Sequence, residues 1–306
     1  MRFARTACLA AVAGIGATAL TVVGIAAPAQ AAVVDAGQAC LTPDTNEAAA
    51  AARGGGSGLD HRGISAAEQR AITRQTNNQL AAKGVTAASG ATALVARKVP
   101  VYVHVMRDRA GRGNVTNRQV ARQVAVLNRD FSGLGYRFDL VRIDRFKNTA
   151  WHKDRRSGHY RAVTRKGGAR ALNIWLVDFA YLGIATFPWD YARRGAVDGI
   201  RVQYNSLPGG NIPHYSEGRT ATHETGHWLG LFHTFQGGCT SLNDQVDDTP
   251  AQASPTSGCP AGRDSCPLDG TDPIHNYMDY SWDSCYSEFT QGQAARAHKM
   301  WTAYRA

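Results

Sequence analysis

The chain has 306 residues, which is enough for one large domain or two ordinary domains. Its formal net charge is +10, and arginines accumulate between residues 107 and 156, whereas residues 244–288 are acidic. Nucleic-acid binding would need basic residues interleaved with base-stacking aromatic residues, and no such module is recognisable. We therefore expect solvated surface charge and no nucleic-acid partner.

Residues 1–31 have the pattern of a secretory signal peptide. Arg2 and Arg5 precede an apolar stretch, and a small-x-small cleavage signal ends at Ala31. A membrane anchor is the alternative, but three glycines interrupt the apolar stretch, and it ends at the cleavage signal. We expect a secreted, monomeric protein with no stable membrane association.

Residues 32–96 contain few bulky apolar side chains and include a run of three glycines at 54–56. One helix is predicted here, over residues 65–83. Such a composition cannot form an independent core of useful size, so we interpret the segment as a propeptide. A disordered linker is the alternative.

The region from residue 97 onward alternates predicted strands and helices, which indicates an α/β fold. Strands are expected at residues 99–106, 136–146, 171–179, 181–187 and 198–205, and helices at residues 116–131, 220–229 and 290–305. The strand at 171–179 is nearly continuously apolar and is therefore expected in the centre of a sheet. Thr290 and Gln293 form a predicted capping box for the last helix.

The segment H-E-T-G-H-W-L-G-L-F-H predicts a zinc site. On a helix, His223 and His227 project from the same face and can bind one Zn²⁺, while Glu224 lies beside the open metal position, where it can act as a general base. Gly230 permits a sharp turn that returns His233 as the third ligand. A buried helix with satisfied histidines is the alternative, but five specified residues at fixed offsets rarely coincide.

A second motif, N-Y-M-D-Y at residues 276–280, places Met278 downstream of the histidines. With this motif, G-R-T-A-T-H-E-T-G-H-W-L-G-L-F-H-T-F at 218–235, D-D-T-P at 247–250 and F-T-x-G-Q at 289–293, the chain resembles the pappalysin-like metzincins, which are secreted zinc endopeptidases. The resemblance covers residues from about 96 to the end. It implies that Met278 forms the Met-turn beneath the metal; a core methionine is the alternative.

The resemblance implies an α/β (α+β) metzincin-type fold for a catalytic domain at residues 97–306. An upper subdomain would hold a mixed twisted sheet with helices. A lower subdomain would be irregular and disulfide-stapled, with the Met-turn and the C-terminal helix. The strand at 181–187 would form the sheet edge that pairs with extended substrate.

Six cysteines are present, and Cys8 leaves with the signal peptide. In an oxidising compartment, Cys239, Cys259, Cys266 and Cys285 can form two disulfides in three pairings; a four-cysteine zinc site is the alternative. The resemblance implies the pairs Cys239–Cys266 and Cys259–Cys285.

The odd cysteine, Cys40, suggests a cysteine switch, in which its thiolate blocks the open zinc position in the precursor. Family segments usually place Arg before and Gly after this cysteine, whereas here Ala39 and Leu41 flank it. A free thiol is therefore the alternative.

The resemblance also implies roles for Tyr280 and Asp283, which both follow the Met-turn in the sequence. Tyr280 would donate a hydrogen bond to the developing oxyanion, unless it is simply a packed tyrosine. Asp283 would lie at the base of the pocket for the residue after the scissile bond and select Arg or Lys, unless it is a turn aspartate. Such selectivity would allow self-cleavage before Arg97.

The acidic loop at residues 243–249 offers hard oxygen ligands that suit Ca²⁺. The resemblance points to Asp244 and Thr249, and a solvated acidic loop is the alternative.

Taken together, these patterns predict a secreted zinc metalloendopeptidase that acts on proteins or peptides. Two alternatives are a zinc-binding module without catalysis and a peptidase limited to short peptides. Glu224 argues against the first, since a structural zinc needs no neighbouring base and usually has four protein ligands.

Overall fold

The computed structural model describes residues 63–85 and 96–306. Two units divide the chain, Met1–Cys40 and Leu41–Ala306, and everything described below belongs to the second. The expected signal peptide and Cys40 lie outside the described residues. Among the described residues, no helix is long and apolar enough to cross a bilayer.

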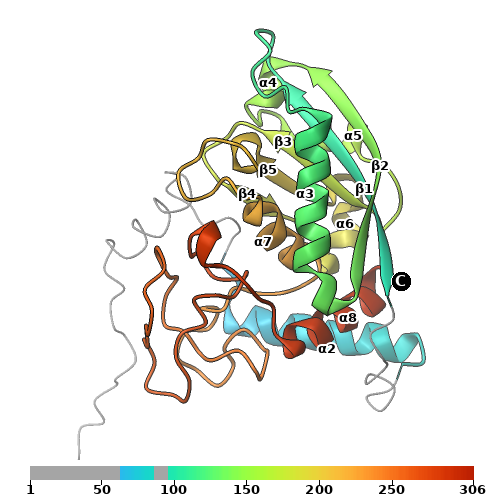
Figure 1. The fold of residues 1–306 in the computed structure, drawn as a ribbon. Coiled ribbons are helices and arrows are strands. Elements are labelled where there is room, and N and C mark those ends of the chain that lie inside the picture. Colours follow the sequence, from blue (N-terminus) through green and yellow to red (C-terminus); the bar gives the residue numbers. More distant parts are fainter. Residues whose placement is uncertain (1–62, 86–95) are drawn as a thin grey trace, which may run out of the picture. The chain divides into compact units, whose positions relative to one another are not determined.

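A five-stranded sheet forms the upper subdomain (Figure 1). Its strands are β1 (Arg97–Arg107), β2 (Tyr136–Lys147), β3 (Leu172–Val177), β4 (Gly183–Ala185) and β5 (Ile200–Gln203). The spatial order is β2-β1-β3-β5-β4, and all neighbours are parallel except β4 and β5. The strand β3 is buried along its whole length and lies in the centre, as its apolar sequence predicts.

Helices cover both faces of the sheet. They are α3 (Asn117–Asp130), α4 (Thr149–His152), α5 (Ser157–Thr164), α6 (Tyr191–Arg194), α7 (Arg219–Trp228) and α8 (Gln291–Tyr304), and α2 (Ala66–Ala82) precedes the sheet. Because side chains alternate along β3, Ile174 packs with α3 and α7 in the main core, whereas Trp175 joins Tyr160 of α5 on the other face. The helix α7 therefore lies against one covered face of the sheet.

Two helices begin at capping boxes. Thr116 and Gln119 cap α3, and Thr290 and Gln293 cap α8, so two otherwise unsatisfied backbone N–H groups are bonded at each helix start. The second box was expected from the sequence and is confirmed.

The chain between α7 and α8 has little regular structure, apart from the 3₁₀ turn η6 (Asp283–Cys285). Two disulfides close it, Cys239–Cys266 and Cys259–Cys285, which is the pairing that the resemblance implies. All four cysteines are thereby used, so the four-cysteine zinc site is excluded.

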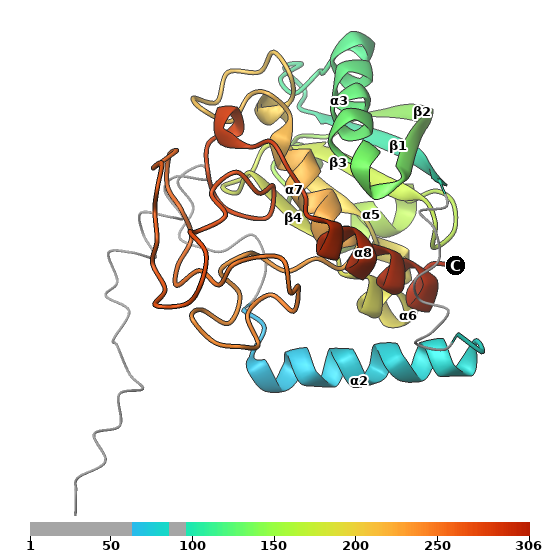
Figure 2. The same ribbon diagram turned by 60° about the horizontal axis from the view of Figure 1, so that its bottom comes forward.

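The helix predicted at residues 65–83 is present as α2, with Ser65 as its N-cap. It belongs to the segment expected to be a propeptide, yet it packs along α8 (Figure 2).

Candidate active site

The helix α7 carries the first two histidines of the motif and is buried from Thr220 to Trp228. It ends in a Schellman turn, in which the N–H groups of Gly230 and Leu231 donate to the carbonyls of His227 and Gly226, at 2.9 and 3.0 Å. Gly230 has φ +97°, a conformation that a side chain rarely tolerates. The turn sends the chain back toward the helix and so brings in the third histidine.

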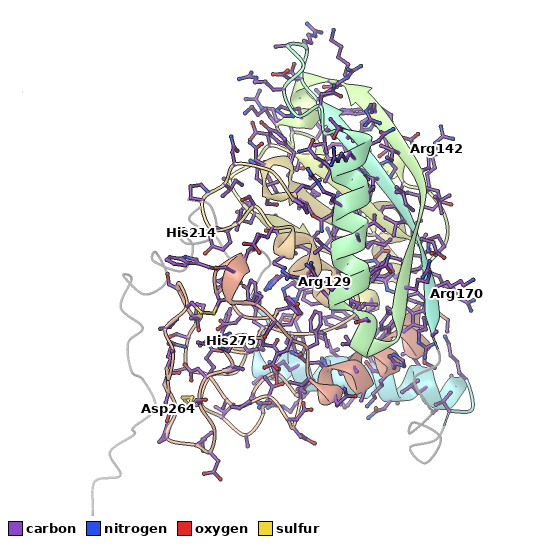
Figure 3. The ribbon with its side chains drawn as sticks, in the orientation of Figure 1. Arg129, Arg142, Arg170, His214, Asp264 and His275 are labelled. Carbon is purple, nitrogen blue, oxygen red and sulfur yellow. A yellow bond between two sulfur atoms is a disulfide. The ribbon has the colours of Figure 1, made fainter. Side chains whose placement is uncertain are left out.

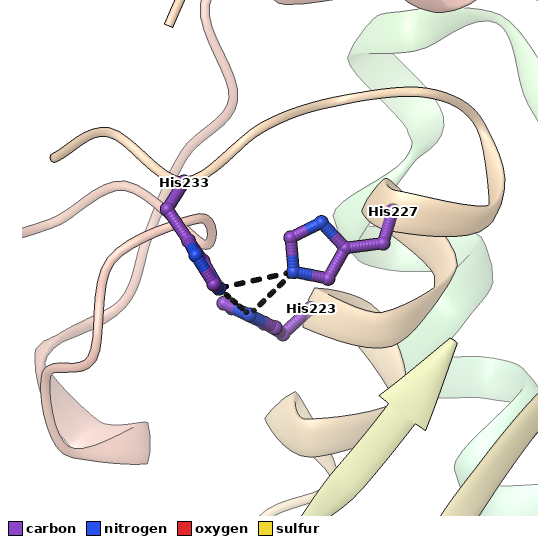
Figure 4. Close-up of side chains that lie close together, drawn as sticks. All are labelled: His223, His227 and His233. Carbon is purple, nitrogen blue, oxygen red and sulfur yellow. Dashed lines mark hydrogen bonds between the residues drawn. The ribbon is translucent and has the colours of Figure 1, made fainter. Parts of the chain in front are cut away.

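The three imidazoles converge on one point (Figure 4). The Nε2 atom of His227 lies 3.1 Å from the Nε2 atoms of both His223 and His233, and the latter two are 3.2 Å apart. The Nδ1 atoms of His223 and His227 lie 2.7 and 2.9 Å from the carbonyls of Tyr277 and Leu231. A carbonyl only accepts, so both Nδ1 atoms carry protons and both Nε2 atoms present lone pairs.

This arrangement fits a zinc ion. Three nitrogens bound tetrahedrally at about 2.05 Å would be roughly 3.3 Å apart, close to the observed separations. Carbonyls that hold the remote nitrogens of metal-binding histidines are the usual support of such sites. A second group, Cys259, Cys285 and His275, also gathers three donor atoms, but its two cysteines form a disulfide.

Met278 lies directly beneath α7. A Cβ atom built on Gly226 would overlap its sulfur, so the glycine inside the histidine motif makes room for the side chain of Met278. Hydrogen bonds of Asn276 hold the turn that contains Met278. The side chain of Asn276 accepts from the N–H of Met278 and exchanges two hydrogen bonds with Gln293 of the α8 capping box. The capping box of α8 therefore also supports the floor of the site.

Glu224 is completely buried beside the edge strand β4. A Cβ atom on Gly183, the first residue of β4, would lie 2.6 Å from its carboxyl carbon and would overlap the neighbouring side-chain atoms. Sequence reasoning did not find Gly183, although a glycine within a strand often marks such a close approach. The edge strand thus confines the Glu224 carboxylate.

Tyr280 completes the aromatic surroundings of the histidines. Its ring centroid lies 4.8 Å from that of His233 and 5.7 Å from that of His223, and Phe235 packs against both Tyr280 and His233. The neighbouring Asp279 carboxylate accepts the N–H groups of Tyr280 and Thr256 at 2.8 and 3.0 Å. Burial raises the pKa of Asp279, while these bonds lower it.

Asp283 is buried at the start of η6. Its carboxylate accepts the N–H of Glu217 at 2.8 Å, and its own N–H donates to the carbonyl of His214. The ring of His214, labelled in Figure 3, stacks on Trp282 with centroids 3.8 Å apart. The loop before α7 and the turn after the Met-turn are therefore bound to each other at Asp283.

Asp244 and Thr249 lie in one loop, and both side chains are buried. Oδ2 of Asp244 and Oγ1 of Thr249 are both buried, and a hydrogen bond between the two side chains helps to lower the pKa of Asp244. Burial raises the pKa of Asp244 to about 7, and Arg296 opposes that rise. Two buried oxygens of this kind suit a hard cation.

The chain is similar to known proteins over this region. Residues 179–302 match the family model described as pregnancy-associated plasma protein-A. An extracellular metalloprotease of Verticillium alfalfae is 50% identical over 226 residues, which are 70% of this chain and 79% of that protein. One from Arthroderma benhamiae is 43% identical over 216 residues, covering 68% and 73%.

Solved structures agree with these relatives. Mature mirolysin of Tannerella forsythia, in complex with a cleaved peptide, has a TM-score of 0.59 and 28% identity, covering 68% of this chain and 91% of its own. A promirolysin mutant from the same organism has a TM-score of 0.62 and 28% identity, covering 77% and 88%.

The fold and the three-histidine site define a metzincin-type zinc metalloendopeptidase, and proteins or peptides are its substrates. The chain belongs to the pregnancy-associated plasma protein-A family of pappalysin-like peptidases.

Proposed function

We propose that an extended peptide binds along β4 and is hydrolysed at the three-histidine site, with Glu224 as general base. The observation that carries this proposal is the confinement of the Glu224 carboxylate between α7 and Gly183. A structural metal site needs no buried carboxylate next to its ligands, so this arrangement favours catalysis over a zinc-binding module.

The reaction divides between a few side chains. His223, His227 and His233 would hold a zinc ion, which would supply the Lewis acidity that makes water nucleophilic at neutral pH. Glu224 takes the proton of the attacking water and passes it to the leaving amine. Tyr280, packed on the ring of His233, donates its phenol proton in a hydrogen bond to the oxyanion.

We assign the selectivity for Arg or Lys after the scissile bond to Asp283. Its burial supports this role, because a carboxylate in a low-dielectric pocket binds a guanidinium or ammonium group strongly. One oxygen is already engaged by the backbone of Glu217, which fixes the orientation of the carboxylate.

A calcium ion bound by Asp244 and Thr249 would be structural. Its loop is joined to the rest of the fold through Gln245, which accepts a hydrogen bond from Arg296 at 3.0 Å. The ion would neutralise a carboxylate that is otherwise held in a buried position.

The precursor is proposed to be exported by its signal peptide, residues 1–31, as the names of the extracellular relatives suggest. Latency would reside in residues 32–96, with Cys40 as a candidate switch, and residues 97–306 would form the catalytic domain. We propose that the enzyme is a monomer and has no stable membrane association.

Cleavage-site mass spectrometry on a denatured protein library tests the function. Cuts before Arg or Lys that disappear with a zinc chelator support the proposal, and Asp283→Asn should abolish the basic preference while leaving cleavage of other bonds. Cleavage confined to dipeptides would indicate a short-peptide peptidase. Stoichiometric zinc without any cleavage would indicate a binding module.

A further inference from the structure

We propose that residues 63–85, which contain α2, stay bound in the active enzyme as a permanent structural element instead of leaving with the propeptide. This inference rests on the proposed processing of a latent precursor. It adds residues 63–85 to the active enzyme, beyond the catalytic domain proposed at residues 97–306. The chain is cut either before residue 63, or after residue 85 with the helix remaining in place.

The first support is an apolar contact behind the metal site. Ile64 and Ile72 are buried and complete a cluster with Phe187, Trp189, Phe232 and Met300. The ring of Phe187 stacks on Trp189, with centroids 4.4 Å apart, and meets the ring of His227 at 5.3 Å. Release of the helix would expose this cluster, one member of which packs against a candidate zinc ligand.

The second support is a set of buried polar contacts. The side chains of Gln69 and Thr76 are completely buried on α2, which packs along α8. Thr76 Oγ1 lies 2.9 Å from the hydroxyl of Tyr304 in α8. Buried polar groups are costly unless they are bonded, so these contacts are specific to the docked helix.

The same helix reaches the candidate calcium loop. Gln69 donates to the carbonyl of Asn243, and Thr73 Oγ1 donates to Oε1 of Gln245 at 3.2 Å. Gln245 also accepts from Arg296, whose Nε donates to the carbonyl of Gly230 at 2.9 Å. A chain of hydrogen bonds therefore connects α2 to the turn that positions His233.

Both ends of the segment are fastened as well. At the start, Gln236 donates to the carbonyl of Ile64 at 2.6 Å. At the end, the Lys83 ammonium donates to the carbonyls of Thr302 and Ala306 at 2.9 and 3.0 Å. The contacts thus extend along the whole segment, and its buried positions 69, 72 and 76 follow helical spacing. A segment that only blocks the cleft would have no need of contacts behind it.

Limited trypsin digestion of the full secreted chain tests the inference, read by intact mass after gel filtration in zinc buffer. Arg70 and Arg74 are exposed on α2 and report on its docking. We expect a resistant product that retains residues 63–85, as one chain or as a co-eluting fragment. A zinc-loaded product that lacks them and keeps the original melting temperature would overturn the proposal. Masses are read whether or not the protein cleaves peptides, so failure of the proposed function would be recognised separately.

A matched pair of variants gives an independent readout. Ile72→Ala removes a buried side chain and should lower the melting temperature by roughly 5 to 10 °C, with release of the helix after trypsin. Gln75→Ala makes the same truncation on the exposed face and should shift the melting temperature by about 1 °C or less. Equal, small shifts of the melting temperature in both variants would contradict a structural role of α2 in the active enzyme.

Discussion

Replacing Gly183 with alanine tests how closely the edge strand confines Glu224. The backbone of Gly183 is extended, so alanine fits the conformation, and only the contact with Glu224 opposes it. Carbon atoms normally approach to about 3.5–4.0 Å, whereas the new Cβ would lie 2.6 Å from the Glu224 carboxyl carbon. Because Glu224 is fully buried, its carboxylate must shift by roughly 1 Å.

A displacement of that size at a catalytic group costs on the order of 100-fold in rate, so kcat/KM for a peptide substrate should fall about 100-fold. Overpacking should also cost about 1–3 kcal/mol in the free energy of unfolding. Gly158→Ala is the matched control, because nothing lies within 4 Å of a Cβ at that position.

A double-mutant cycle separates the proposed contact from a general strand defect. In a Glu224→Ala background the colliding atoms are gone, so Gly183→Ala should cost little stability there. Equal destabilisation in both backgrounds, or a kcat/KM within threefold of wild type, would refute the reasoning.

Further predictions concern buried charges. Burial lowers the pKa of His104 from 6.5 to about 4. As pH falls from 6.5 to 4, the free energy of unfolding should therefore decline by about 3 kcal/mol more in wild type than in His104→Leu. Free energies of unfolding that fall in parallel for the two proteins would contradict this. Arg305→Ala leaves Asp198 buried without the guanidinium that bonds it at 3.0 Å, and chemical denaturation should show a loss of about 3–5 kcal/mol; a loss below about 1 kcal/mol would refute it. Calcium should raise the melting temperature more at pH 8 than at pH 6, because Asp244, with a pKa of about 7, must lose its proton to bind the ion. The variant Asp244→Asn should remove this calcium-dependent shift. A calcium response that survives in Asp244→Asn would place the ion elsewhere.

Much of the fold could be predicted because its signals are local. Apolar spacing and a threonine cap indicate α3, a continuous apolar run indicates the central β3, and the glycine after His227 indicates the end of α7. The short helices α4 and α5 were not predicted, because they are stabilised by packing on the sheet more than by their own sequence pattern.

The supports of the site depend on contacts between distant residues, so the sequence does not reveal them. Gly183 and Glu224 meet only because β4 passes beside α7, and Asp198 meets Arg305 across more than one hundred residues. The docking of α2 is of the same kind, since its composition alone favours a detachable segment.

The most direct test of the central claim is peptide hydrolysis by Glu224→Gln, measured together with its zinc content. Glutamine keeps the shape of the side chain and cannot take a proton. The account expects one zinc per chain and a kcat lowered by 10²- to 10⁴-fold, the usual contribution of a general base. Full zinc occupancy with kcat within tenfold of wild type would show that Glu224 is not the base.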